Sequence, residues 1–230
     1  MEPRSLSFAD RLIGEIDKAI KVLACPPHAA REFPSGAPTA PVSAAASSPG
    51  GAAPDAAPAL SESERHQAVR LMRVNHAGEV AAQALYQGQA LTARNAAVAT
   101  AMRGAATEEI DHLSWCQQRL DELQGRTSLL NPLWYAGSFA IGAVAGALGD
   151  RTSLSFIAET EKQVESHLSD HLDRLPIADR RSRAVLEQMK HDEIEHGALA
   201  TSLGARTLPF PLRMAMRLTS RLMTRGSYWL

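Results

Sequence analysis

Two short motifs in this chain place a glutamate three residues before a histidine: Glu109 with His112, and Glu193 with His196. On a helix, residues with this spacing lie on one face, so each motif presents a carboxylate and an imidazole to the same point in space. Such a pair is half of a binding site for a transition metal. One copy alone is weak support, because Glu and His are common on solvated surfaces.

Each motif is preceded at a similar distance by another glutamate. Glu79 lies 30 residues before Glu109, and Glu161 lies 32 residues before Glu193. Two antiparallel helices place such a pair at one depth when the turn between them falls near the midpoint. Turn-favouring residues stand near both midpoints, at Thr92, Arg94, Asn95, Pro176 and Asp179. We therefore predict a duplicated helical hairpin.

Four helices would bring six candidate metal ligands to one level of a bundle: Glu79, Glu109, His112, Glu161, Glu193 and His196. One Glu from each of two helices and a Glu-x-x-His from each of two others is the ligand set of a di-iron or di-manganese carboxylate site. Oxygen and imidazole ligands without thiolate favour Fe or Mn over a structural zinc site. By analogy, Glu109 and Glu193 would bridge the metals, and Glu79 and Glu161 would be terminal ligands.

Other acidic residues compete for these roles or support them. Glu165 and Glu159 are alternatives to Glu161, which we prefer because its distance from Glu193 matches the first hairpin best. Asp192 and Glu108 each precede a candidate ligand, and they either orient the histidine rings or are plain surface charges.

The remaining histidines and one tyrosine stand outside the repeated pattern. We expect structural roles for His76, His167, His171 and His191, with a proton relay as an alternative for His167. Tyr86 is expected to pack in the core, with lining of a pocket beside the metals as the alternative.

The elements that position these residues are predicted to be helices. Helical patterns cover about 61–93, 96–123, 154–175 and 179–203, and Ser61 with Glu64 forms a capping-box pattern. Alternating β-branched runs and hairpin turns are almost lacking. The sequence therefore predicts an all-α fold, a ferritin-like four-helix bundle.

Composition divides the chain into three parts. Residues 1–25 contain an amphipathic helix, expected from Ser7 to Ala24, and 26–59 are rich in Ala, Pro, Ser and Gly, typical of a flexible linker. Residues 60–230 would form the catalytic domain.

The net charge of -1 argues against nucleic acid as a partner. Only two cysteines occur, and no signal peptide is recognised, which favours a reducing compartment.

Two apolar segments suggest contact with a membrane. The 23 residues between Arg126 and Asp150 carry no charge, and they include the apolar crossover expected at 129–148. Pro132 is expected to start its helix, and the 17 residues from there to Leu148 span roughly 25 Å, short of a hydrocarbon core of roughly 30 Å. A single crossing would also separate the two ligand pairs, so we predict an interfacial crossover helix, with a buried crossover helix as the alternative. Residues 207–225 are predicted to form a basic amphipathic helix that binds an anionic membrane or packs on the bundle, with arginines at Arg213, Arg217, Arg221 and Arg225.

Four segments together carry a family resemblance: "RLMRVNHAGEVAAQALYQGQAL", "EEIDHLSW", "ETEKQVESHL" and "DEIEHG". In this order the chain resembles the demethoxyubiquinone hydroxylases of ubiquinone biosynthesis, in their bacterial form. The resemblance implies an O₂-dependent monooxygenase that hydroxylates the ring of demethoxyubiquinol. It also implies two Fe ions per subunit held by the six residues above, and an external electron donor.

Such an enzyme would bind peripherally to the cytoplasmic face of the bacterial inner membrane, where a polyprenyl substrate resides. The same six residues leave three alternative functions open. The protein could be a di-iron oxidase without a quinone substrate, a ferritin-like iron-storage protein, or a structural bundle that binds no metal. The sequence leaves open the prenyl chain length, the electron donor, a homo-oligomeric state, and partners among other ubiquinone-biosynthesis proteins.

Overall fold

The computed structural model of the chain describes residues 8–34 and 60–230, and every regular element in these ranges is an α-helix. The predicted all-α fold is confirmed. Residues 1–7 and most of the predicted linker, 35–59, lie outside the described residues. The helices are α1 (Phe8–Ala24), α2 (Glu62–Thr92), α3 (Ala96–Glu122), α4 (Asn131–Ala147), α5 (Asp150–Arg174), α6 (Arg180–Ser202) and α7 (Phe210–Trp229).

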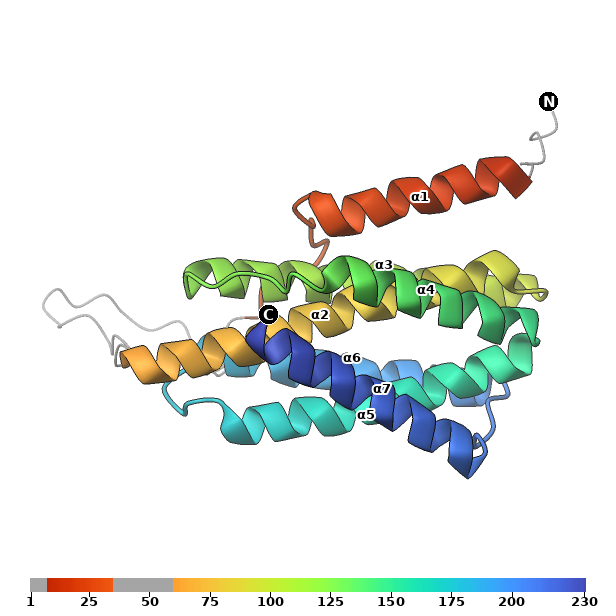
Figure 1. Cartoon of the computed structure of the whole chain (residues 1–230). Coiled ribbons are helices and arrows are strands. Elements are labelled where there is room, and N and C mark those ends of the chain that lie inside the picture. Colours follow the sequence, from red (N-terminus) through yellow and green to blue (C-terminus); the bar gives the residue numbers. More distant parts are fainter. Residues whose placement is uncertain (1–7, 35–59) are drawn as a thin grey trace, which may run out of the picture.

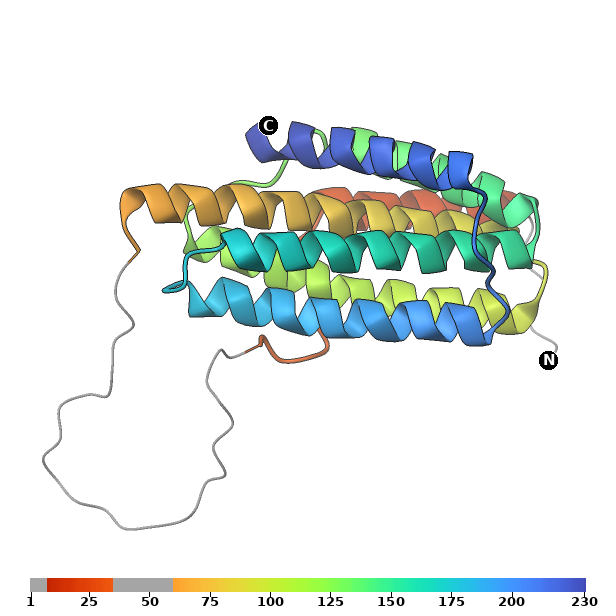
Figure 2. The same ribbon diagram turned by 90° about the horizontal axis from the view of Figure 1, so that it is seen from below.

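Two antiparallel hairpins, α2 with α3 and α5 with α6, form the bundle (Figure 1). Helix α4 runs from the end of α3 back along the bundle to the start of α5, and it packs mainly on α2. Helix α7 returns along the same side (Figure 2). This arrangement is consistent with a ferritin-like helical bundle.

Side-chain caps set the starts of the bundle helices. Ser61 Oγ accepts a hydrogen bond from Glu64 N at 3.3 Å, and Glu64 Oε2 accepts one from Ser61 N at 2.9 Å, which confirms the predicted capping box. Asn95 caps α3 and Asp179 caps α6. Helix α5 begins at Asp150, earlier than predicted, and the carboxylate of Asp150 accepts hydrogen bonds from the turn between α2 and α3. Helix α7 continues past the predicted end at 225.

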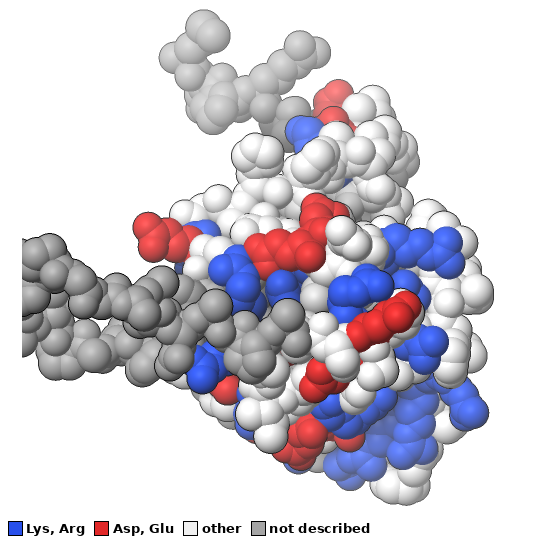
Figure 3. Space-filling model, turned by 90° about the vertical axis from the view of Figure 1, so that its left-hand side faces the viewer, with Lys and Arg blue, Asp and Glu red and all other residues white. Residues whose placement is uncertain are grey.

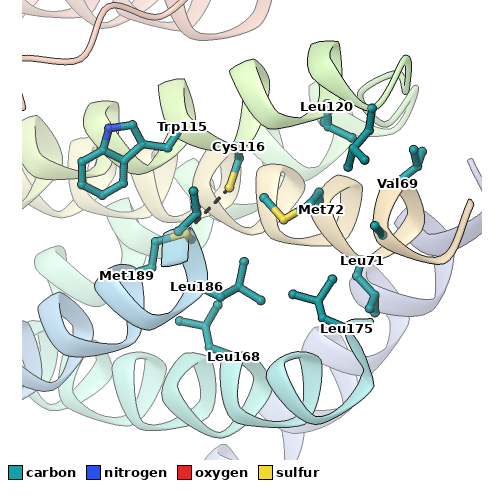
Figure 4. Close-up of a cluster of buried hydrophobic side chains, with 13 residues drawn as sticks. Val69, Leu71, Met72, Trp115, Cys116, Leu120, Leu168, Leu175, Leu186 and Met189 are labelled. Atoms are coloured by element: carbon teal, nitrogen blue, oxygen red, sulfur yellow. Dashed lines mark hydrogen bonds between the residues drawn. The ribbon is translucent and has the colours of Figure 1, made fainter. Parts of the chain in front are cut away.

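The two larger layers of the apolar core lie one toward each end of the bundle, and a smaller cluster around Val80 and Leu113 packs against Tyr135 of α4. The larger layer is shown in Figure 4, where Met72, Leu120, Leu168 and Leu186 converge from four helices and Cys116 Sγ lies 3.8 Å from Met189 Sδ. The second layer surrounds Met102 and its neighbours on α2, α3, α5 and α6. On every one of these helices, the candidate metal ligands lie between these two layers.

One face of α4 lies very close to α2. A Cβ atom added at Gly142 would clash with the carbonyl oxygen of Leu85, so a larger residue would push the two helices apart. The opposite face leaves Leu133, Val144 and Leu148 exposed. The structure therefore shows packing on one face and a free apolar face on the other, and an interfacial role for this helix stays a prediction. None of the described helices is long and apolar enough to cross a membrane.

The predicted N-terminal helix is present as α1, and the chain that follows it contacts the bundle. Helix α1 turns Ala19 and Val22 toward the bundle but leaves Ile13, Ile16 and Ile20 exposed, so much of its apolar face is uncovered by the described chain. Of the predicted flexible linker, 26–59, only residues 26–34 are among the described residues. Residues 26–34 lie against α3 and α6, because Arg31 forms ion pairs with two aspartates there.

Candidate metal centre

All six predicted ligands meet between the two apolar layers, and every one of them is buried. They form two overlapping groups that share Glu193. The first holds Glu79, Glu109, His112 and Glu193, and the second holds Glu161, Glu193 and His196. Within each group, one potential ligand atom per residue lies within 4.8 Å of the others, a spacing that could hold a metal ion.

Two glutamates stand between the histidines. Glu109 places one carboxylate oxygen 3.2 Å from His112 Nδ1 and the other 3.5 Å from His196 Nδ1. Glu193 places one carboxylate oxygen 3.5 Å from His112 Nδ1 and the other 3.4 Å from His196 Nδ1. Each carboxylate therefore faces both imidazoles, as a bridging ligand must. Glu79 lies only near the first histidine, with an oxygen 3.7 Å from His112 Nδ1.

Several of the atoms that face one another have no hydrogen-bond partner among the described residues. They are Glu79 Oε2, Glu109 Oε1, Glu193 Oε2 and His196 Nδ1. Buried polar atoms are nearly always satisfied, and buried carboxylates are costly without a compensating positive charge. One cation in each of the two groups would satisfy these four atoms. The residues present thus fit a metal pair held by oxygen and imidazole ligands.

The electrostatics of the cluster lead to the same conclusion. Burial, together with the charge of Glu109, raises the pKa of Glu79, and burial with the charge of Glu193 raises the pKa of Glu161. Burial alone would lower the pKa of His196, but the nearby carboxylates of Glu109 and Glu193 raise that pKa to about 12. Without metal, the cluster therefore keeps protons in the places that cations would take.

Each histidine is oriented from behind by a carboxylate of the opposite hairpin. His112 Nε2 donates to Asp192 Oδ2 at 2.8 Å, and His196 Nε2 donates to Glu108 Oε2 at 3.0 Å. These contacts leave both Nδ1 atoms facing the cluster. The expectation that Asp192 and Glu108 orient the rings, rather than being plain surface charges, is confirmed as a contact.

The competing residues are separated clearly. Glu161 joins the cluster, whereas Glu165 is half-buried and outside it, and Glu159 accepts a hydrogen bond from Gln163 at 2.8 Å. Tyr86 packs in the core as predicted, and it also contacts the cluster: its hydroxyl donates to Glu161, and its ring lies edge-on to His196 at 6.5 Å. The sequence indicates that Tyr86 lies near the ligands, since Tyr86 follows Glu79 by two helical turns on the same face.

The other histidines stay outside the cluster. His171 Nδ1 lies 2.8 Å from Asn75 Oδ1, and burial lowers the pKa of His171 to about 2. Burial likewise lowers the pKa of His76 and of His167 to about 4, so these rings are neutral. His191 is exposed. Sequence reasoning missed Arg31 and Asp111, which pair outside the cluster, because nothing in their local sequence marks them.

A helical bundle with a buried set of four carboxylates and two imidazoles defines the class of ferritin-like carboxylate proteins that can bind metal. The family model described as "Ubiquinone biosynthesis protein COQ7" matches residues 66–227, and the chain belongs to this family.

Several similar proteins are named 3-demethoxyubiquinol 3-hydroxylase. The one from Ralstonia pickettii is 57% identical over 219 residues, which cover 95% of this chain and 98% of the relative. The one from Chromobacterium violaceum is 50% identical over 220 residues, covering 95% and 98%. The one from Nitrosomonas europaea is 59% identical over 170 residues, covering 74% of this chain and 82% of the relative.

Proposed function

We propose that this protein is a 3-demethoxyubiquinol 3-hydroxylase, an O₂-dependent di-iron monooxygenase that converts 3-demethoxyubiquinol to 3-demethylubiquinol in ubiquinone biosynthesis. The observation that carries the proposal is the buried cluster of four glutamates and two histidines, with a carboxylate behind each histidine. Relatives that cover nearly the whole chain have this name, which supports the same activity here. In this proposal residues 60–230 form the catalytic domain.

The proposed ligands divide the work. Glu109 and Glu193 would bridge two iron ions, while Glu79 with His112 and Glu161 with His196 would complete the two positions. When bound, an iron pair activates O₂ for insertion of one oxygen atom into the ring, with electrons from an external donor. The protein buries the six proposed ligands, and the carboxylates behind the histidines hold the rings in place.

An apolar cavity beside the cluster supports the approach of an aromatic substrate. It is lined by Tyr86 and His196 on the inner side and by Leu199 and Leu203 on the outer side. Its volume is about 20 Å³, enough for a water-sized molecule but not for a ring. The two leucines are partly exposed, so we propose that they move aside when the quinol ring enters.

Exposed apolar and basic residues support binding to a membrane surface. Leu133 and Leu148 on α4 are exposed, as are Leu218 and Leu222 on α7. The exposed arginines of α7 are Arg217, Arg221 and Arg225. Figure 3 views the molecule from the left-hand side of Figure 1, and Lys and Arg side chains gather at the lower right of this view. We propose peripheral binding to the cytoplasmic face of the inner membrane, where the prenyl tail stays in lipid.

The test is chromatographic analysis of quinones from bacterial cells that lack the protein. We expect the demethoxy precursor to accumulate and the parent gene to restore ubiquinone. The variant Glu109→Ala should fail to restore it, whereas Glu165→Ala, which alters a glutamate outside the cluster, should succeed. Normal ubiquinone in the deletion strain would contradict the proposed function and leave an iron-storage role or another oxidase activity.

A further inference from the structure

A short segment after α1 lies across the outer side of the metal centre. This segment, residues 26–34, is called the N-terminal strap. Arg31 Nε donates a hydrogen bond to Asp111 Oδ2 at 2.7 Å, and Arg31 Nη1 forms an ion pair with Asp192 Oδ2 at 2.8 Å. The guanidinium also lies over the ring of Trp115, 4.7 Å from its centroid. Arg31 thus joins the strap to both α3 and α6.

Other contacts fix the strap on either side of Arg31. Ala30 N donates to Asp111 Oδ1 at 2.6 Å, and Ser114 Oγ donates to the carbonyl oxygen of Pro27 at 3.2 Å. Farther along, the ring of Phe33 lies beneath the guanidinium of Arg181 at 4.7 Å. The strap is therefore held at several points, and Arg31 is its only contact with Asp192 among the described residues.

Asp192 connects this strap to a candidate ligand. Its Oδ2 atom accepts a hydrogen bond from His112 Nε2 at 2.8 Å and forms an ion pair with Arg31 Nη1, also at 2.8 Å. Its Oδ1 atom accepts from Gln188 Nε2 at 2.8 Å. A carboxylate held by several charge-assisted hydrogen bonds has little freedom to rotate. The orientation of the His112 ring thus depends on a carboxylate that Arg31 helps to fix.

The other histidine has no comparable support. Glu108, the carboxylate behind His196, has a side chain that is 52% exposed, whereas that of Asp192 is 7% exposed. In the described ranges, no lysine or arginine forms an ion pair with Glu108. The two halves of the centre therefore resemble each other in their ligands but differ in what holds those ligands.

We propose that Arg31 is a positioning residue that fixes His112 through Asp192, so that the N-terminal strap makes the His112 half the more tightly held of the two metal positions. This inference rests on the proposed metal centre. It gives the region before the bundle a role in the metal site. Arg31 itself touches none of the proposed ligands directly.

The test is an anaerobic titration of the full-length, metal-free protein with Co²⁺, followed by calorimetry and by visible absorption of the bound ion. In Arg31→Gln, we expect one of two binding steps to weaken by about tenfold, the lower end of the effect of altering partners behind a ligand. The other step should stay within about twofold. The absorption of the weakened position should also change, because a looser His112 alters its coordination geometry.

Two further variants separate positioning from a general loss of structure. Arg181→Gln removes the contact with Phe33 without touching Asp192, so both binding steps should remain as in the parent. Asp192→Asn should weaken the same step as Arg31→Gln, and the double variant should bind no more weakly than Asp192→Asn alone. Arg31→Lys, which keeps the charge but not the forked geometry, should fall between Arg31→Gln and the parent.

The outcomes are distinguishable from failure of the metal centre itself. If the parent does not bind two Co²⁺ ions, the proposed metal centre is wrong. If the parent binds two and Arg31→Gln binds both unchanged, or weakens both equally, the positioning role is wrong. Full additivity of Arg31→Gln and Asp192→Asn would also overturn it, because Arg31 would then act by another route.

Discussion

The hydroxyl of Tyr86 on α2 donates a hydrogen bond to Glu161 on α5, so a residue of the first hairpin holds a proposed ligand of the second. Burial raises the pKa of Tyr86 well above its usual value, and the charge of Glu161 adds to this effect. The phenol therefore stays protonated and remains a donor throughout the physiological pH range. Tyr86 also lines the cavity beside His196, which places it between the metal centre and the proposed substrate path.

Replacing Tyr86 by Phe should lower hydroxylase activity by about tenfold, because Glu161 loses the partner that orients it. Metal content should remain at the parent level, since no proposed ligand is removed. The matched control is Tyr135→Phe: the Tyr135 hydroxyl donates to Gln87, away from the cluster, so activity should change little. Equal losses in both variants, measured by steady-state turnover, would argue against a specific role for Tyr86.

Glu193→Ala and His196→Ala should each abolish hydroxylation while helicity stays nearly unchanged. The loss should exceed the roughly 100-fold upper range for partners behind a ligand, since a ligand itself is removed. Helicity should persist because a buried carboxylate without its metal does not stabilise the fold. Turnover and far-ultraviolet circular dichroism provide the two readouts, and Glu165→Ala is the control. Activity retained in either variant would mean that α6 does not supply ligands.

Metal binding should release protons. In the metal-free protein the pKa of His196 is raised to about 12, and those of Glu79 and Glu161 are also raised, so these groups hold protons that the metal must displace. Lower pH favours the protonated, metal-free state, so the affinity for metal should rise between about pH 6 and pH 8. Calorimetry in buffers of different ionisation enthalpy measures the release. Heats that are independent of the buffer would contradict this expectation.

Binding to anionic liposomes should weaken when Arg213, Arg217, Arg221 and Arg225 are replaced by Gln. Each arginine near an anionic surface contributes roughly 1 kcal/mol, and salt screens this term while the exposed leucines of α4 and α7 still bind. Co-sedimentation should therefore fall far more on anionic than on neutral lipid. The matched control replaces exposed basic residues on other helices, namely Arg103, Arg151, Lys162 and Arg180. If both variants pellet like the parent, the electrostatic part of the membrane proposal is wrong.

The six clustered residues were predictable because helical periodicity is a local property. A glutamate three residues before a histidine shares its face in any helix, and the near-equal distances to Glu79 and Glu161 reveal the hairpins without knowledge of the packing. The same reasoning identified Asp192 and Glu108, which directly precede two of these residues.

Contacts between distant segments were not predictable in this way. Arg31 pairs with Asp192 although 160 intervening residues separate them, and the surrounding composition resembles a free linker. The role of α4 was ambiguous for another reason, since glycine and alanine favour close packing while leucine and valine suit a membrane surface. The structure shows that the small residues pack on α2 and that larger apolar side chains are exposed on the opposite face of the same helix.

The most direct test of the central claim is a reaction of purified, iron-loaded protein with demethoxyubiquinol, an electron donor and O₂ made of a heavy oxygen isotope. Mass spectrometry of the product quinol measures the origin of the new hydroxyl oxygen. We expect one heavy oxygen atom on the ring, and none when Glu109 is replaced by Ala. A hydroxyl oxygen derived from water, or no hydroxylated product with the parent protein loaded with two iron ions, would contradict the proposed di-iron monooxygenase.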